Sequence, residues 1–328
     1  MKLGSLNLTN RYILAPMQNV TTAPYRRFCR KLQEIGLVSV PMLYTRGISK
    51  NPKSMVHKLY KIEEERPISV QLIGSDEYAL RKSIDYLESY KFDILDINAG
   101  CPSRRAMKAC EGGYLMNDIV RLKKLLKIAV KYSSRPISLK IRTGFEKPMK
   151  ISEISKIVNN SGIDILIIHA RTVKSNYQDG ALDLETVKRL KEKLSIPLVG
   201  NGNITSPISA KKFIDDTKVD ALMIGRESMG NPMIFKQIHE YLTRGIIIPI
   251  VNNAKMVRNN LRIYEDVIDE LLESHSYPYG EDEFKFKELK RNSIWLTKDI
   301  KNSTKIRTIL SKTKNLEQLK TTLNEIFN

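Results

Sequence analysis

The stretch DILIIHA, residues 164–170, decides the fold, and DALMIG, residues 220–225, repeats its pattern. Both are short and almost uninterrupted apolar runs, without the polar alternation of a strand that has one face in water. Such runs are typical of parallel strands that are covered on both faces. Six more runs of this kind are found at residues 12–17, 37–43, 67–73, 92–98, 136–141 and 196–200. The sequence therefore predicts eight strands.

Stretches with helical periodicity separate the strands, at residues 76–90, 117–132, 152–161 and 184–194. Two of them begin at N-cap signals, Ser75-Asp76 and Asn117-Asp118. Eight strands that alternate with helices over roughly 240 residues predict a TIM (β/α)8 barrel. An open doubly wound sheet is the alternative.

The strand pattern stops after Gly245, and the remaining chain has helical periodicity at residues 252–274, 283–298 and 304–327. We therefore expect an α/β protein with two domains. A catalytic (β/α)8 barrel would occupy residues 1–241, and a C-terminal all-α helical domain would occupy residues 242–328.

The charge balance favours a polyanionic partner. The chain has 328 residues, 41% of them hydrophobic, and 55 Lys and Arg against 36 Asp and Glu give it a net charge of +19. Residues 285–320 hold eleven Lys or Arg and three Asp or Glu, so this segment alone carries +8. A basic excess of this size is typical of proteins that bind nucleic acid.

The same composition excludes other classes of protein. No stretch reaches about 18 uninterrupted apolar residues, and the N-terminus lacks a signal-peptide core, so we expect no membrane segment. Three cysteines are too few for a secreted disulfide scaffold. The sequence predicts free thiols in a reduced, cytoplasmic protein, which we expect to be a monomer.

Polar side chains stand where the predicted strands end. In a barrel these ends and the loops after them form the catalytic face. The residues are Gln71, Asn98, Lys140, Arg142, His169, Asn201 and Arg226. Stability alone explains such a convergence poorly, so we expect these residues to line one site.

A phosphate-bearing cofactor is expected at the last two strands. Gly200-Asn201-Gly202 and Gly225-Arg226 place amide-rich turns and a fixed cation where barrels commonly hold a phosphate. Glycines needed only for tight turns are the alternative. Lys140, at a strand end, needs a partner for its charge, and an anionic group of the cofactor would supply one.

Cys101 is the candidate catalytic residue. It stands between Gly100 and Pro102 after the fourth strand, close to Arg104 and Arg105, which favours an exposed and acidic thiol. Cys110 lies nine residues further along the same loop, and no metal site is expected there because the spacing and the four histidines do not suit one. Neither a GxSxG elbow nor a GxxxxGK loop occurs, which disfavours serine hydrolase and ATP chemistry.

These segments resemble those of the tRNA-dihydrouridine synthases, in family order and at family spacing over residues 6–241. The matching motifs are LAPMQNVTTAPYRRFCR, VQLIG, DINAGCPSRRAMK, LKIRTG, IHART, GNGNI and MIGRESMGNPMIF. The resemblance implies an FMN-dependent barrel, NADPH (or NADH) as reductant, and tRNA as substrate. Its reaction is hydride transfer from reduced flavin N5 to C6 of a uracil, which yields 5,6-dihydrouridine.

The resemblance also implies roles for individual residues. The flavin ring would be lined by Pro16, Met17 and Gln18. Its polar edge would be bound by Gln71, Asn98, Lys140 and His169. The ribityl phosphate would be held by Asn201, Gly202, Asn203, Gly225 and Arg226. Cys101 would deliver the proton to C5, and Arg142 would face the substrate base or its phosphates. The candidate tRNA surface is made of Arg104, Arg105, Lys287, Lys290 and Arg291.

Some positions depart from the family pattern, and two other functions stay open. Gln18-Asn19 stand where Ala-Gly is common, Glu227 where a small residue is usual, and Cys110 in a loop normally rich in glycine. A free-pyrimidine flavoenzyme of the dihydroorotate or dihydropyrimidine dehydrogenase type would share the barrel and the cysteine loop. A tRNA-binding protein without chemistry would share the charge.

Overall fold

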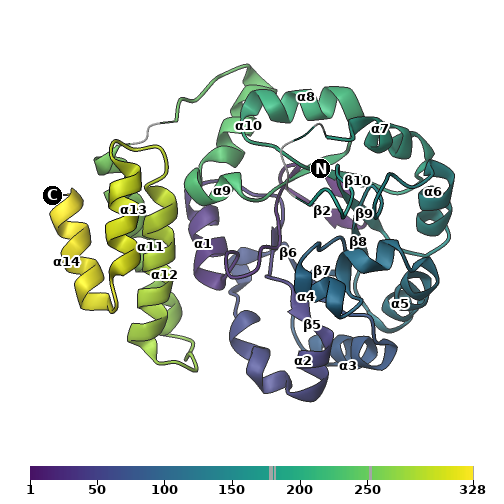
Figure 1. The fold of residues 1–328 in the computed structure, drawn as a ribbon, viewed down its shortest axis with the longest axis horizontal. Coiled ribbons are helices and arrows are strands. Elements are labelled where there is room, and N and C mark those ends of the chain that lie inside the picture. The colour runs from purple at the N-terminus through teal and green to yellow at the C-terminus, as the bar shows by residue number, and fades with distance from the viewer. Residues whose placement is uncertain (177–179, 181, 251–252, 328) are drawn as a thin grey trace.

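Eight parallel strand positions form a barrel in the computed structural model, which describes residues 1–176, 180, 182–250 and 253–327 (Figure 1). The sheet runs in the order β3-β11-β10-β9-β8-β7-β6-β4. The strands are β3 (Tyr12–Leu14), β4 (Val38–Ser39), β6 (Ile68–Ile73), β7 (Ile94–Ala99), β8 (Ile137–Arg142), β9 (Ile165–His169), β10 (Leu198–Asn201) and β11 (Ala221–Ile224). All eight predicted strands are confirmed.

The barrel closes between β3 and the residue just before β4. Leu37 forms a parallel bridge with Ile13, and the Leu14 amide donates to the Leu37 carbonyl at 2.9 Å. Because the first and last strands of the sheet meet in this way, the open doubly wound alternative is wrong. The predicted TIM-type fold is confirmed.

The second predicted strand, residues 37–43, is interrupted. It forms β4 and a separate β5 (Leu43–Tyr44), both paired with β6. Val38 pairs with Ile68 whereas Leu43 pairs with Leu72, so one extra residue bulges out between the two pairs. Pro41 lies in this bulge, where its missing N–H costs no ladder hydrogen bond.

Helices surround the sheet, and the predicted N-caps are confirmed. Asp76 accepts from the Ala79 amide at 2.7 Å, and Asp118 accepts from the Arg121 amide at 3.0 Å. The helices are α1 (Ala23–Leu32), α2 (Thr45–Lys50), α3 (Glu77–Leu87), α5 (Ile119–Tyr132), α6 (Ile151–Asn159), α7 (Leu184–Lys193), α8 (Pro207–Thr217) and α10 (Ile234–Arg244). Shorter helical segments are α4 (Arg104–Lys108), α9 (Glu227–Gly230), η1 (Pro52–Lys58), η2 (Glu63–Glu65) and η3 (Gly112–Met116).

An N-terminal hairpin covers the end of the barrel at which the strands begin. It consists of β1 (Lys2–Leu3) and β2 (Leu6–Asn7). Leu3 and Leu8 are buried in one cluster with apolar residues such as Ile165 and Val199 from the barrel strands. The hairpin therefore leaves the opposite, carboxyl end of the strands for a site.

Four helices follow the barrel, yellow-green to yellow in Figure 1: α11 (Ala254–Leu272), α12 (Glu281–Leu296), α13 (Ser303–Lys312) and α14 (Leu316–Phe327). The prediction of one helix over residues 304–327 is wrong. The chain breaks at Thr313, whose backbone is extended, and Asn315 then caps the next helix by accepting from the Gln318 amide at 2.9 Å. The predicted start of the first helix, Asn252, lies outside the described residues.

The helical part packs tightly on α1 of the barrel. Phe28 meets Tyr264 edge to face with centroids 5.2 Å apart, and the Thr22 hydroxyl donates to the buried Glu288 carboxylate at 3.0 Å. The division at residue 241 stays a prediction, since α10 continues across it. Within the described residues, no helix combines the length and apolar character needed to cross a membrane.

Candidate active site

A cavity of about 970 Å³ opens at the carboxyl end of the barrel strands. It collects residues from loops that are far apart in sequence. All twelve residues predicted to bind the cofactor line it, together with Cys101 and Arg142. The structure therefore brings the predicted site residues to one place, while their individual roles stay predictions.

Several lining residues were missed by sequence reasoning. Among them are Met42, from the bulged second strand position, and Glu227, which directly follows Arg226. Lys298, in the turn after α12, is the only lining residue among the described residues that comes from the chain beyond α10. Its ammonium lies 3.5 Å from the Glu227 carboxylate. A proline inside a predicted strand indicates an interruption, so Pro41 was the available sequence signal for Met42. No local pattern connects Lys298 with the barrel mouth.

Asn98 holds the start of the cysteine loop. Its side-chain oxygen accepts from the backbone amides of Gly100 at 3.1 Å and Cys101 at 2.9 Å. Its amide nitrogen donates to the Gln71 oxygen at 2.8 Å. Much of the hydrogen-bonding capacity of Asn98 is therefore used within the protein.

Cys101 is half-buried with its side chain in the cavity wall. Its carbonyl accepts from the Gly113 amide at 2.9 Å, and a Cβ on Gly113 would come within 2.8 Å of that oxygen. Only glycine allows this close approach. Cys110, by contrast, is not a lining residue, and it adopts a left-handed φ of 54°. The structure thus separates the two thiols.

Lys140 and His169, which line the cavity, both have lowered pKa values. Enclosure by protein lowers the pKa of the Lys140 ammonium to about 8, although the Asp96 carboxylate works against this shift. Within the described residues, its one hydrogen bond is a long one of 3.5 Å to Asn201. Burial and then the nearby cations, Lys140 first, lower the pKa of His169 to about 2, so its imidazole is neutral at physiological pH.

Arg142 lies deeper than its predicted role suggests. It is 2% exposed, and its guanidinium donates to the carbonyls of Gly100 at 3.0 Å and Thr172 at 2.8 Å. It also donates to the Asn176 carbonyl at 2.6 Å. Arg142 therefore ties the cysteine loop to the loop after β9, as well as lining the cavity.

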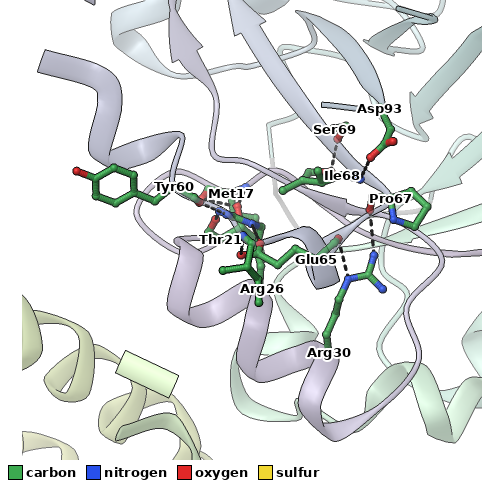
Figure 2. Close-up of polar contacts among 12 residues, drawn as sticks. Met17, Thr21, Arg26, Arg30, Tyr60, Glu65, Pro67, Ile68, Ser69 and Asp93 are labelled. Atoms are coloured by element: carbon green, nitrogen blue, oxygen red, sulfur yellow. Dashed lines mark hydrogen bonds and ion pairs between the residues drawn. The ribbon is translucent and has the colours of Figure 1, made fainter. Parts of the chain in front are cut away.

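The loop after β3 carries Met17 and Gln18 and is held from behind by Arg26 (Figure 2). The guanidinium of Arg26 is fully buried and pairs with Glu65 at 2.7 Å. It also donates to the carbonyls of Thr21 at 2.8 Å and Tyr60 at 2.7 Å. Because Thr21 in turn bonds the Met17 backbone, the buried ion pair fixes the base of the loop.

The glycine turns form the other wall. Gly202 has a φ of 138°, a conformation open to glycine, and the Asn201 side chain donates to the Met223 carbonyl at 2.7 Å. A Cβ on Gly225 would come 3.4 Å from the Met17 sulfur, so this turn passes close to the opposite loop. Arg226 is exposed at the rim.

The five predicted tRNA-binding residues lie outside the cavity. Arg104 and Arg105 are exposed on α4, and Arg105 stacks 3.5 Å above the Tyr44 ring. The three on α12 have partners within the chain: Lys287 pairs with Glu283, Lys290 donates to the Thr313 carbonyl, and Arg291 pairs with Glu288. The basic residues of α13, including Lys305 and Arg307, are more exposed and were not singled out from the sequence.

Comparison with solved structures shows the fold. Morphinone reductase has a TM-score of 0.53 at 13% identity, over 77% of this chain and 90% of that one. A 2-naphthoyl-CoA reductase has a TM-score of 0.54 at 14% identity, over 73% of this chain and 51% of that one. At such low identity these likenesses show the fold alone.

Comparison with sequences shows the family. The family model described as Dihydrouridine synthase (Dus) matches residues 13–328. The tRNA-dihydrouridine synthase B of Pseudomonas aeruginosa is 33% identical over 283 residues, which are 86% of this chain and 82% of that protein. That of Vibrio parahaemolyticus is 37% identical over 250 residues, 75% of this chain and 76% of that protein. The chain belongs to the dihydrouridine synthase family.

Proposed function

We propose that the protein uses FMN and NADPH to reduce the C5–C6 double bond of a uridine in tRNA, giving 5,6-dihydrouridine. The observation that carries this proposal is the cavity itself. It sets the Cys101 thiol in the same wall as a group of buried hydrogen-bonding side chains and a cation, Lys140. A purely structural RNA-binding protein has no need of such a cavity.

The cavity residues fit a flavin on three counts. The side-chain oxygen of Gln18 is buried and has no hydrogen-bond partner among the described residues. Such an atom favours a bound donor group. The Lys140 ammonium, with its single long hydrogen bond, favours a carbonyl or an anion. The volume of about 970 Å³ accommodates a flavin beside a base.

Lys140, Gln71 and His169 would bind the polar edge of the ring. Gln71 keeps one N–H and one lone pair beyond its contacts with Asp96 and Asn98. His169 is neutral because its pKa is low, so it presents one donor and one acceptor. Asn201, Gly202, Asn203, Gly225 and Arg226 would hold the phosphate at the other wall.

A bound, reduced flavin would supply the hydride that C6 of the uracil accepts. The Cys101 thiol would hold the proton that C5 needs and would donate it to C5 from the cavity wall. Asn98 and Gly113 fix the backbone on both sides of this thiol, so its position is set before substrate binds. Arg142 holds the same loop through its hydrogen bond to the Gly100 carbonyl.

The target base must leave the tRNA stack to reach the cavity. Arg226 of the barrel and Lys298 of the C-terminal part both line this cavity and add positive charge there. The exposed basic residues of α4 and α13 would hold neighbouring phosphates. A reduced, cytoplasmic setting agrees with Cys29, Cys101 and Cys110, which are free thiols.

The experiment is a reconstitution with defined substrates. The purified protein receives FMN and NADPH, and in separate arms unmodified tRNA, free uridine, uracil or orotate. We expect a mass gain of two hydrogen atoms in tRNA alone. Equal reduction of a free pyrimidine would favour the other flavoenzyme class, and tRNA binding without product under any reductant would favour a non-catalytic role.

A further inference from the structure

Asp96 is a buried carboxyl group to which the proposed reaction gives no role. It lies on β7, in register with Gln71 on β6 and Ser138 on β8, and it is 2% exposed. One carboxylate oxygen accepts from the Gln71 amide nitrogen at 2.5 Å, and the other accepts from the Ser138 hydroxyl at 2.6 Å. Asp96 itself does not line the cavity.

From Asp96 a continuous chain of hydrogen bonds leads to the cysteine loop. The Gln71 oxygen accepts from the Asn98 amide nitrogen at 2.8 Å. The Asn98 oxygen then accepts from the backbone amides of Gly100 and Cys101. Asn98 stands two residues after Asp96, so both side chains leave the same face of β7.

The two ends of this chain determine its direction. A carboxylate only accepts, so Gln71 must turn its NH2 group toward Asp96 and its oxygen toward Asn98. Backbone amides only donate, so Asn98 must turn its oxygen toward the loop and its NH2 group toward Gln71. A flip of either side-chain amide would set two donors or two acceptors against each other, which leaves buried groups unsatisfied.

We propose that Asp96 is a positioning residue that orients the Gln71 and Asn98 amides and through them holds the backbone of Cys101. The proposal rests on the role of Cys101 given above and adds a second function to Gln71, which would both face the cofactor and transmit this orientation. The contacts concerned are all within the protein, so they can be tested without cofactor or substrate.

Three variants distinguish the effect of the hydrogen-bond acceptor of Asp96 from the effects of its negative charge and of its side-chain packing. Asp96→Asn keeps the chain, because the new amide can turn its oxygen to Gln71 and its NH2 group to the Ser138 hydroxyl, which can accept. Asp96→Leu has a similar size and no acceptor. Ser138→Ala is the matched control, because it removes the other hydrogen bond of the same carboxylate.

The readouts are hydrogen exchange of the Gly100 and Cys101 amides, and the rate at which iodoacetamide alkylates Cys101 relative to Cys110. In Asp96→Leu we expect both amides to exchange about fivefold faster or more, which is the effect of one lost hydrogen bond, and Cys101 to be alkylated faster. Asp96→Asn and Ser138→Ala should stay close to the wild type. Asn98→Ala, which removes the direct acceptor, gives the full effect for comparison.

The proposal would be overturned if the Gly100 and Cys101 amides of Asp96→Leu exchanged at the wild-type rate. It would also be overturned if Asp96→Asn raised their exchange rates as much as Asp96→Leu does. A third contrary result would be an equal rise in the exchange rates of all amides in β6, β7 and β8. If Asp96→Leu does not fold, Gln71→Met breaks the next link, and unchanged exchange there would overturn the proposal as well. Since neither readout uses substrate, a negative result leaves the proposed reaction standing. Normal exchange in a wild-type protein that makes no dihydrouridine would instead count against that reaction.

Discussion

The ammonium group of Lys140 stands in the cavity with little hydrogen bonding of its own. Protein atoms enclose it enough to lower its pKa to about 8, and Asn201 is 3.5 Å away. A cation in such a place gains from any anion or carbonyl that enters, because partial enclosure by protein strengthens the electrostatic attraction. The binding of a flavin should therefore depend on this one side chain.

Lys140→Met should weaken FMN binding by about tenfold to a hundredfold, the effect of losing one charged hydrogen bond. Titration by quenching of flavin fluorescence measures it. Lys174→Met, which alters an exposed lysine paired with Glu146, is the control and should bind FMN as the wild type does. Undiminished affinity in Lys140→Met would remove Lys140 from the flavin site.

The lowered pKa also predicts a pH dependence. In the protein without flavin, Lys140 is charged below about pH 8 and loses its proton above it. If FMN requires the ammonium, its affinity should fall by up to about tenfold per pH unit above that value. The same titration, repeated between about pH 7 and about pH 10, should show this slope in the wild type and a flatter one in Lys140→Met. Parallel slopes would show that another group is responsible.

Among the elements, helix α1 forms a buried ion pair on one face and a partly exposed ion pair on another. Its inner face carries Arg26, whose guanidinium reaches Glu65 and the carbonyls behind the Met17 loop (Figure 2). Its outer face carries Lys31, which pairs with Glu270 of α11 near the surface. Removing the partner of a buried charge lowers the stability of the fold far more than removing the partner of an exposed charge.

Arg26→Ala should lower the free energy of unfolding by about 3–5 kcal/mol, because Glu65 would stay buried without its partner. Lys31→Ala, on the same helix, should cost less than about 1 kcal/mol, since its ion pair is exposed. Chemical denaturation of both variants measures the difference. Similar losses in the two would mean that the Arg26 network contributes no more than a surface pair.

The elements were predictable wherever a local signal existed. The apolar run at residues 164–170 and the caps Asp76 and Asp118 are local signals, and β9, α3 and α5 follow them. The single helix expected over residues 304–327 failed because its apolar period continues through Thr313. The backbone there is instead bonded by Lys290 from α12, a contact that lies beyond any local pattern.

In the whole molecule, the barrel and the C-terminal helices share a core. Tyr264 packs on Phe28 and donates to Glu288, which also accepts from Thr22 of the barrel. Removal of the helices would expose these groups, so truncation is a poor test of tRNA recognition. Surface substitutions in the complete chain are better, because they leave this core intact.

The salt dependence of tRNA binding locates the RNA surface. Lys305, Arg307 and Lys312 of α13 are exposed, and none forms an ion pair within the part of the chain that the structure describes. Their replacement by Gln should weaken tRNA binding and reduce the slope of log K against log salt by about 0.7–0.9 for each lost phosphate contact.

The matched control replaces Lys123, Lys124 and Lys127, three exposed residues of α5 on the side of the barrel away from α13 (Figure 1). It changes the net charge equally and should leave the slope almost unchanged. The same reduction in both triple variants would mean that total charge, and not the α13 surface, governs binding.

The predicted family and its barrel are confirmed, and the cavity residues were predictable because they lie in the last residues of strands or in the loops that follow. Lys298 and Asp96 could not be found in that way. Lys298 reaches the rim from another part of the chain. Asp96 lies inside an apolar strand, and its partners come from the neighbouring strands. Contacts between segments far apart in the sequence determine both positions, and the local spacing of residues does not reveal such contacts.

The proton donor is the central claim, and a single-turnover assay of two cysteine variants tests it most directly. Each protein, reduced by NADPH, is mixed with unmodified tRNA, and dihydrouridine is counted by mass. Cys101→Ala should keep FMN and tRNA binding and lose about 10² to 10⁴ in rate, the usual effect of one general acid. Cys110→Ala, outside the cavity, should react as the wild type does. An active Cys101→Ala beside a crippled Cys110→Ala would contradict the account.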